Sequence, residues 1–297
     1  MKHIFILILS LSSFAVFADP ALEAAAILRR HQAVRGISHR IEAFSREFLS
    51  LPYGDGGPLG EGIVGRYDQD PLYRFDTFDC TTYVETVLAL SHATNATDFA
   101  QHMDDIRYEN GLVDYTTRNH WPSLQWVPNN IQNGYLRDIT RDVAPQGVVK
   151  VARAIIDIPN SYRFMTADLL RVPGLSPAER EVRAQEWRNE ANRFSAQEAT
   201  IDYVPVDWIM QNQNWLQAIP HGTVVNMVRP NWDLTDIIGT HMNVSHQGLI
   251  IRRGEQVMLR HASSTGTKRV IEVPLVDYLR PFIGHATLKG VHFLATE

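Results

Sequence analysis

Phe78-Asp79-Cys80-Thr81-Thr82-Tyr83-Val84-Glu85 is the stretch from which the rest of the fold is interpreted. It contains the single cysteine of the 297-residue chain, and an apolar run typical of an α-helix follows over residues 83–90. We expect a helix to begin at Cys80, so that the thiol faces unpaired amides and the positive end of the helix dipole. Such a position lowers the pKa of a thiol and raises its thiolate fraction, as a nucleophile requires. The alternative is a buried, small apolar residue without a chemical role.

The N-terminus predicts export. A basic start at Lys2 precedes an apolar run over residues 4–17, and Ala18 supplies a small residue at a cleavage position. This is the pattern of a secretory signal peptide over residues 1–18, and the run is short for a membrane span. We therefore expect a periplasmic or secreted protein without stable membrane insertion. An uncleaved anchor is the alternative.

Composition narrows the function classes. Lys and Arg number 28 against 33 Asp and Glu, giving a formal net charge of −5 and no basic footprint for nucleic acid. A single cysteine excludes an internal disulfide, but a mature chain of about 280 residues can bury a sizeable core without one. The oligomeric state stays open.

Helical patterns come first along the chain and strands come later. Residues 20–50 and 95–108 have helical spacing, whereas five short β-prone runs, separated by turns, follow residue 201. This order predicts an α+β fold with an antiparallel sheet. Residues 51–62 carry five glycines and two prolines and must form a loop, which is either a plain connection or a rim of the site containing Tyr53. Residues 141–200 include a charged helix with a capping box, and we interpret them as an insertion or cap.

Two of the 12 histidines lie in adjacent β-prone runs, His246 in 244–251 and His261 in 256–262. A hairpin loop of two residues at 253–254, or of four residues at 252–255, would set the rings directly opposite each other on one face. One imidazole could then act as a base that the other orients, which completes a nucleophile–base–orienter set with Cys80. Two structural histidines are the alternative. A zinc site with His241, His246 and Cys80 is disfavoured, because the five-residue spacing puts the two histidines on opposite faces of a strand.

These residues resemble a known family. The stretch 78–85 is similar to the cysteine motif of the NlpC/P60 papain-like hydrolases, and in particular of the DUF1460, or N-acetylmuramoyl-L-alanine amidase-like, family. Ser245-His246-Gln247-Gly248-Leu249 resembles the family's base strand, and His261-Ala262-Ser263-Ser264 the strand with its third polar residue. Leu51-Pro52-Tyr53 is similar to its Pro-Tyr segment. The resemblance covers residues 45–140 and 220–294, leaves 141–200 unmatched, and is looser at Arg118-Asn119-His120-Trp121.

The resemblance implies one papain-like amidase domain over residues 19–297, with the cysteine helix packed on the sheet. It implies Cys80 as nucleophile, His246 as base and His261 as the orienting residue. The oxyanion and substrate would lie near Tyr53, Asp79 and Ser245, and the groove near Arg118, His120 and Trp121. The substrate would be peptidoglycan or a muropeptide, cut at the muramoyl–L-alanine amide, without a metal or organic cofactor. A stem-peptide endopeptidase, a non-catalytic cell-wall binding protein and a thiol-redox or metal protein are the competing hypotheses.

Overall fold

The computed structural model describes residues 19–55 and 57–297, so the predicted signal peptide lies outside the described residues. Within these two ranges, no helix combines the length and apolar character that crossing a membrane requires.

The N-terminal half is helical, as expected from its spacing. Side-chain caps set several helix starts: Asp19 accepts a hydrogen bond at the first helix and Asn95 at the fourth. The helices of this half are α1 (Pro20–Arg30), α2 (Ile37–Glu47), α3 (Cys80–His92), α4 (Ala96–Arg107) and α5 (Val127–Gln132). The 83–90 run is the interior of α3, and nearly all of that helix is buried.

The strands form one antiparallel sheet in the order β2-β3-β8-β4-β5-β6-β7, with β1 paired to β8. Their bounds are β1 (Leu136–Asp138), β2 (Lys150–Ile156), β3 (Gln197–Pro205), β4 (Val224–Leu234), β5 (Thr240–Arg253), β6 (Gln256–Ala262), β7 (Val270–Pro274) and β8 (Gly290–Thr296). The five β-prone runs correspond to β4–β8. The predicted α+β class with an antiparallel sheet is confirmed.

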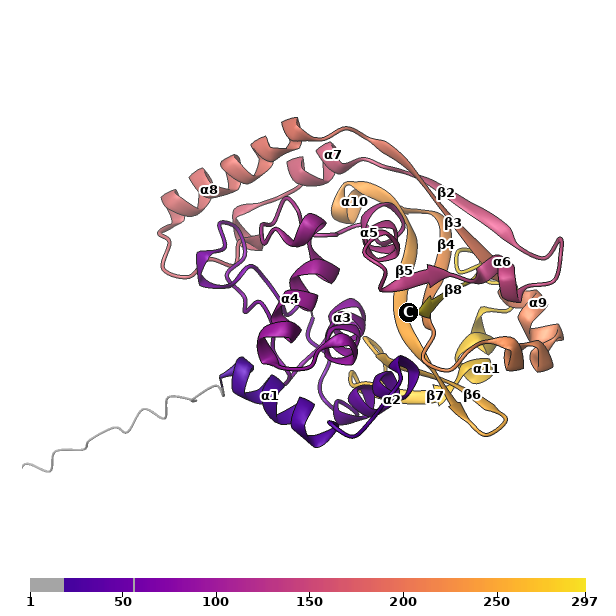
Figure 1. Cartoon of the computed structure of the whole chain (residues 1–297). Helices are drawn as coiled ribbons and strands as arrows, with labels where there is room; N and C mark the ends of the chain where they lie inside the picture. The colour runs from indigo at the N-terminus through magenta and orange to yellow at the C-terminus, as the bar shows by residue number, and fades with distance from the viewer. Residues whose placement is uncertain (1–18, 56) are drawn as a thin grey trace, which may run out of the picture.

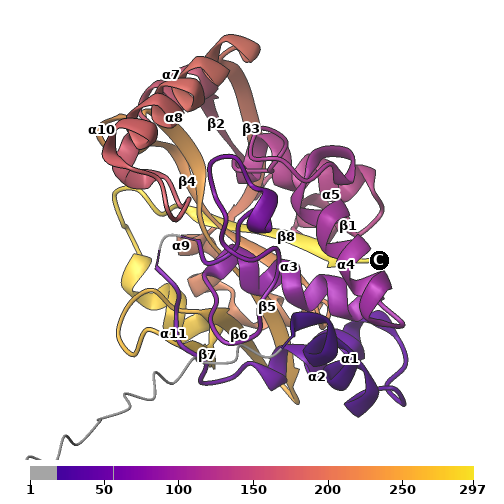
Figure 2. The same ribbon diagram turned by 90° about the vertical axis from the view of Figure 1, so that its left-hand side faces the viewer.

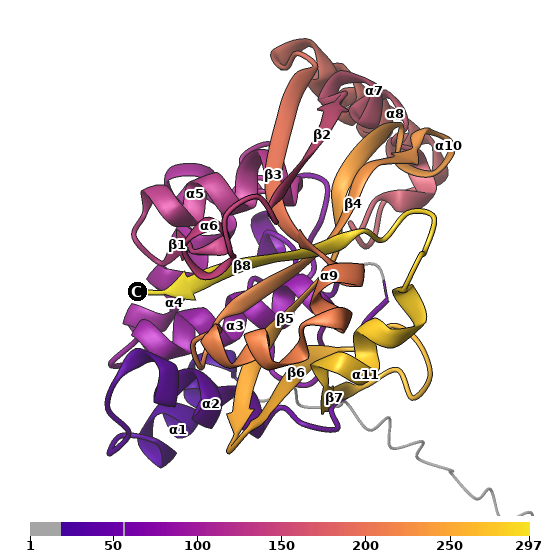
Figure 3. The same cartoon turned by 90° about the vertical axis from the view of Figure 1, so that its right-hand side faces the viewer.

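The sheet has a different helical layer on each face. Leu249 and Ile251 of β5 join a core with α1–α4, whereas Ile250 joins a second core with α9 (Val206–Gln211) and α11 (Leu275–Leu279). Figure 1 shows α1–α4 on one side of the sheet and α9 and α11 on the other, and Figure 3 shows the α9/α11 side. Alternating residues of β5 therefore face different helices.

The segment 141–200 extends the sheet and also covers a loop. The segment begins in the short helix α6 (Thr140–Val143) and contributes strands β2 and β3. Between these strands lie α7 (Ile158–Arg163) and α8 (Pro177–Asn189). The remaining short helix, α10 (Thr235–Ile238), lies outside the segment and precedes β5. The capping box predicted at Ser176 and Glu179 is present. Helix α8 lies over the loop that precedes α3 (Figure 2), where Tyr67 stacks on Trp187 with ring centroids 5.3 Å apart.

The β5–β6 hairpin corrects the predicted register. Leu249 pairs with Arg260 and Arg253 with Gln256, so the loop is Gly254-Glu255, one position later than predicted. Gly254 has φ +61°, and a two-residue hairpin turn of type II′ requires positive φ at its first residue. The observed pairing of β5 with β6 is consequently shifted by two residues from the predicted pairing, and a shift of two residues leaves each side chain on the same face of the sheet. His246 and His261 are thus diagonal neighbours on one face rather than directly opposite.

Candidate active site

The first residue of α3 is Cys80, and the preceding residue fixes the helix start. The carboxylate of Asp79 accepts hydrogen bonds from the Thr82 amide at 2.7 Å and hydroxyl at 2.8 Å, while the Asp79 amide donates to Thr82 Oγ1 at 3.0 Å. This reciprocal box satisfies donors at the helix N-terminus. Cys80 is partly exposed there.

The environment of the thiol is opposite to the one expected from a helix start. Burial raises the pKa of Cys80 to about 12, and the Asp79 carboxylate adds to this, while a backbone hydrogen bond from Gln247 acts in the opposite direction. The expectation of a lowered pKa was therefore wrong. A carboxylate at the N-cap opposes the positive end of the helix dipole next to the sulfur. Burial and the Asp79 carboxylate thus favour the protonated thiol over the thiolate.

The two strand histidines are in direct contact. Nε2 of His246 lies 2.7 Å from Nδ1 of His261, with ring centroids 4.8 Å apart and planes at 89°. Tyr278 of α11 covers both rings, stacked on His246 at 6.1 Å and edge-on to His261 at 5.3 Å. Burial lowers the pKa of His246 to about 3 and of His261 to about 4. Burial thus favours the neutral form of both imidazoles, and Nε2 is the nitrogen of His246 that faces His261.

Gly248 makes room for this contact. A Cβ at this position would lie 3.1 Å from Cβ of His261 and 2.7 Å from Cδ1 of Leu259, the first tighter than ordinary packing and the second too close without movement. The backbone of the β5–β6 pair can approach closely here only because residue 248 has no side chain.

Tyr53 lies beside the thiol, and backbone hydrogen bonds hold it there. The Phe78 amide donates to the Pro52 carbonyl at 3.2 Å, and the Gly54 amide donates to the Phe78 carbonyl at 2.9 Å. Burial raises the pKa of the Tyr53 phenol, and the neighbouring Cys80 and Asp79 raise it further. The phenol is therefore a proton-bearing donor close to the sulfur.

Ser245 has no comparable contact with the thiol or the histidines. Its hydroxyl donates to the carbonyl of Met227 at 3.4 Å, and it is the extra residue of β5 at the register shift beside that pair. Its proposed place near the substrate rests on proximity in sequence to His246.

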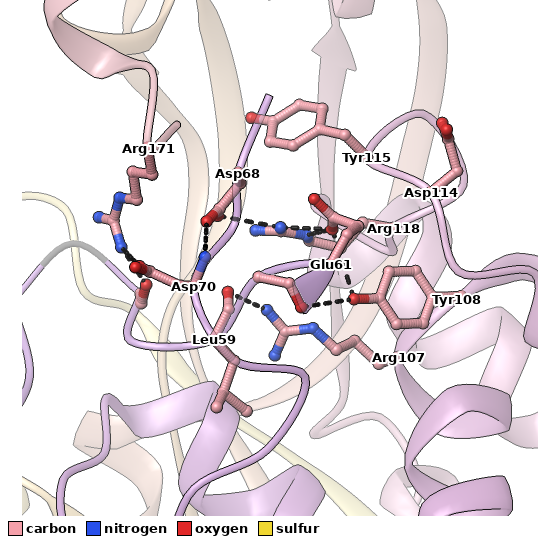
Figure 4. A network of polar contacts seen from close by, with 12 residues as sticks. Leu59, Glu61, Asp68, Asp70, Arg107, Tyr108, Asp114, Tyr115, Arg118 and Arg171 are labelled. Atoms are coloured by element: carbon pink, nitrogen blue, oxygen red, sulfur yellow. Dashed lines mark hydrogen bonds and ion pairs between the residues drawn. The ribbon is translucent and has the colours of Figure 1, made fainter. Parts of the chain in front are cut away.

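Arg118, His120 and Trp121 do not form an open groove. Nε of Arg118 donates to Glu61 Oε1 at 2.7 Å, Nη2 donates to Asp68 Oδ2 at 3.0 Å, and only 13% of the side chain is exposed. The ring of His120 bonds the Tyr115 carbonyl at 2.9 Å, and Trp121 is 8% exposed. Figure 4 shows Arg118 between Glu61 and Asp68. Arg118 instead fastens the loop before α3, Trp121 belongs to the same buried cluster as Tyr67 of that loop, and His120 bonds within its own segment.

The disfavoured zinc site would need His241, His246 and Cys80 to lie together. Across the described ranges, no group of three or more His, Cys, Asp or Glu side chains is arranged to hold a metal ion. His241 instead faces Asp233, with Nε2 3.8 Å from Oδ1.

Tyr278, Gly248 and Gln247 were not singled out from the sequence. Tyr278 belongs to a five-residue helix too short to give a periodic signal, and it reaches the histidines only through tertiary packing. Gly248 and Gln247 lie within the strand motif, and a glycine inside a β-prone run does indicate a close approach.

Comparison with known proteins agrees with the resemblance. The family model described as N-acetylmuramoyl-L-alanine amidase-like matches residues 43–284. A Legionella pneumophila protein of the DUF1460 family has 32% identity and a TM-score of 0.89, with 93% of this chain and 94% of that chain covered. An N-acetylmuramoyl-L-alanine amidase from Bacteroides uniformis has 23% identity and a TM-score of 0.61, covering 88% of this chain and 99% of that chain, which shows a shared fold.

A search of curated proteins gives no match. The family model alone covers more than half of the sequence. The chain belongs to the N-acetylmuramoyl-L-alanine amidase-like family, DUF1460.

Proposed function

We propose that this protein is an exported cysteine amidase that hydrolyses the N-acetylmuramoyl–L-alanine amide of peptidoglycan or muropeptides. Membership of the amidase-like family supports a hydrolase acting on peptidoglycan. The observation that carries the cysteine mechanism is the hydrogen-bonded His246–His261 pair on β5 and β6, one residue from the Gln247 backbone that bonds Cys80. In the same proposal, residues 1–18 are a signal peptide, and 19–297 form one NlpC/P60 papain-like domain with 141–200 inserted.

The attack begins from neutral groups. Sγ of Cys80 bonds to the carbonyl carbon of the lactoyl amide while its proton passes to Nδ1 of His246. Nε2 of His246 keeps its proton and donates to Nδ1 of His261, which stabilises the imidazolium that forms. The backbone amide of Cys80 and the Tyr53 hydroxyl donate to the oxyanion.

Collapse of the tetrahedral intermediate completes acyl transfer. The carbon–nitrogen bond breaks, His246 returns the proton to the leaving amine of L-alanine, and a muramoyl thioester remains on Cys80. Water then attacks the thioester as His246 accepts its proton, and transfer of that proton to sulfur restores the thiol. The step is redox-neutral and uses only water as co-reactant.

The pH profile distinguishes this route from a preformed thiolate–imidazolium pair. Because burial holds the pKa of Cys80 at about 12 and that of His246 at about 3, kcat/KM should stay flat across the neutral range. A bell-shaped dependence of kcat/KM on pH, limited by a low thiol pKa on the acid side and a higher histidine pKa on the alkaline side, would contradict the neutral starting state.

Mass spectrometry of muropeptide digests tests the reaction. Wild type and Cys80→Ala are incubated with sacculi and with soluble muropeptides, and circular dichroism verifies that both are folded. Free stem peptide released by wild type alone supports the amidase. Cuts within the stem would move the assignment to the endopeptidase, equal cleavage by Cys80→Ala would exclude the cysteine mechanism, and binding without cleavage would favour the non-catalytic protein.

A further inference from the structure

Arg229 lies on the same side of the sheet as the catalytic base. On β4 it follows Met227 by two residues, and Met227 pairs with His246. The register shift after that pair adds Ser245 on β5 and no residue on β4. Alternation along β4 therefore carries the Arg229 side chain to the face of His246.

Among the residues that the structure describes, no carboxylate forms an ion pair with the half-buried Arg229. The two fully buried arginines each have one: Arg107 pairs with Glu85 at 2.9 Å, and Arg260 pairs with Glu272. Nη1 of Arg229 donates to the hydroxyl of Thr287, and the guanidinium lies 5.1 Å from the ring centroid of Trp232. Its Nε is buried and makes no hydrogen bond with any described residue.

This arrangement indicates a binding group rather than a structural one. The half-buried cation is desolvated, which lowers the pKa of Arg229, and the Tyr278 phenol is the one group that acts on it in the opposite direction. Partial desolvation of a cation costs free energy, and a ligand carboxylate would offset that cost by supplying the counter-charge. A guanidinium with an unused Nε and an aromatic support presents the planar fork that suits a carboxylate.

Tyr278 connects Arg229 with the reaction centre. Burial raises the pKa of Tyr278 to about 12, and the phenol is close enough to Cys80 and to Arg229 to respond to both. The same ring stacks on His246. Tyr278 is therefore a neighbour of Cys80, of His246 and of Arg229.

We propose that Arg229 binds a free carboxylate of the stem peptide next to the amide that Cys80 attacks, and so selects acidic stems. The inference rests on the proposed amidase function and names its substrate class. For a cut at the muramoyl–L-alanine amide, the carboxylate in reach is that of the glutamate that follows L-alanine. Stems in which this group is a primary amide would be poor substrates.

The experiment compares two disaccharide tripeptide muropeptides that differ only in whether this glutamate carries a carboxylate or a primary amide. Charge-assisted bonds of this kind change kcat/KM by about 10- to 100-fold, and wild type should prefer the acid by that factor. Arg229→Gln should lose the preference by slowing on the acid alone, whereas Arg229→Lys should keep part of it. Arg280→Gln is the control, because this exposed α11-adjacent arginine pairs with Asp277 at the surface.

Each outcome decides the proposal. Equal rates of wild type on both muropeptides, or an equal loss on both in Arg229→Gln, would overturn it, and the wild-type comparison does not depend on whether the variants fold. Calorimetric binding to Cys80→Ala separates this inference from the proposed function. Tighter binding of the acid that Arg229→Gln abolishes, without cleavage by wild type, would support the carboxylate site and refute the amidase. Neither binding nor cleavage would overturn both.

Discussion

This protein has two sets of buried polar side chains, one in the loop before α3 and one in the candidate site, and they differ in charge. In the loop network of Glu61, Asp68, Arg107 and Arg118, Arg118 donates to the carboxylates of Glu61 and Asp68, and Arg107 donates to the Leu59 carbonyl (Figure 4). Arg107 also pairs with the Glu85 carboxylate at 2.9 Å. In the candidate site, His246 and His261 contact each other beneath Tyr278, and burial disfavours the charged forms of both imidazoles and of the Cys80 thiol.

This difference matches two different roles, a structural role for the ion pairs and a chemical role for the neutral groups. A buried ion pair is locked, because removing either charge strands the other in a medium of low dielectric constant. A neutral thiol and imidazole hold no such charge, so in the proposed mechanism a proton can move between them when a developing oxyanion makes the transfer favourable. The network fixes the loop before α3, and the site keeps its reactivity.

The largest expected effect is on catalysis alone. His246→Ala removes the base and should lower kcat/KM by at least roughly 10³-fold, as loss of a general base does. Because the resting imidazole carries no charge, its loss strands no buried ion, and the unfolding midpoint should fall less than it does for Arg118→Met. Activity assays with thermal unfolding check both parts, with His241→Ala on the same strand as the matched control. Activity near wild type in His246→Ala would remove this residue from the mechanism.

The loop network should show the reverse pattern. Arg118→Met strands Glu61 and Asp68, so the free energy of unfolding should fall by about 3–5 kcal/mol. The folded fraction should still release stem peptide, because Arg118 is buried away from the thiol among Tyr115, Glu61 and Asp68. Urea titration measures the loss, and Arg137→Met, whose ion pairs are exposed, should shift stability by less than about 1 kcal/mol. A stable but inactive Arg118→Met would return Arg118 to the substrate groove.

Local signals predicted much of this arrangement. The apolar run after Cys80 and the β-prone runs after residue 201 are properties of short windows, and α3 and β4–β8 appear where those windows indicate. The predicted hairpin correctly placed both histidines on one face of the sheet, because its register error was two residues and such an error does not move a side chain to the other face. The register itself depended on one backbone angle, the positive φ of Gly254.

What failed depended on tertiary surroundings. The pKa of Cys80 is set by burial and by the direction of the Asp79 carboxylate, and neither can be read from the residue types. Arg118 was expected in a groove from the family resemblance of residues 118–121, whereas Glu61 and Asp68, 50 or more residues earlier in the chain, bond its guanidinium inside the protein. Tyr278 reached the site from α11 with no motif of its own.

A smaller effect tests how tightly the histidine pair is packed. Gly248→Ala brings a methyl group against Cβ of His261 and Cδ1 of Leu259, which should destabilise the protein by about 1–3 kcal/mol. The displaced ring would orient His246 less well, and kcat/KM should fall by about 10- to 100-fold. A double-mutant cycle with His261→Ala identifies the cause, because the kinetic penalty of Gly248→Ala should disappear in that background. An undiminished penalty would assign it to Leu259 or the backbone instead.

The smallest effect compares the two sets of residues in one titration. Burial lowers the pKa of His246 and of His120 to about 3, well below the value that each has in the unfolded chain. Between about pH 6.5 and the lowered value, only the unfolded state binds these protons, so stability falls as pH falls, by at most roughly 1.4 kcal/mol per pH unit for each ring. His246→Gln and His120→Gln should each flatten the pH dependence of the unfolding free energy, measured by urea titration, over this window. Asp104, whose pKa burial raises to about 6, contributes with the opposite sign in all three proteins.

Only His246→Gln should also abolish stem-peptide release, because His120 bonds the Tyr115 carbonyl and His246 bonds His261. A slope that neither substitution changes would mean that water reaches both rings in the native state, and the neutral starting point of the mechanism would then have to be abandoned.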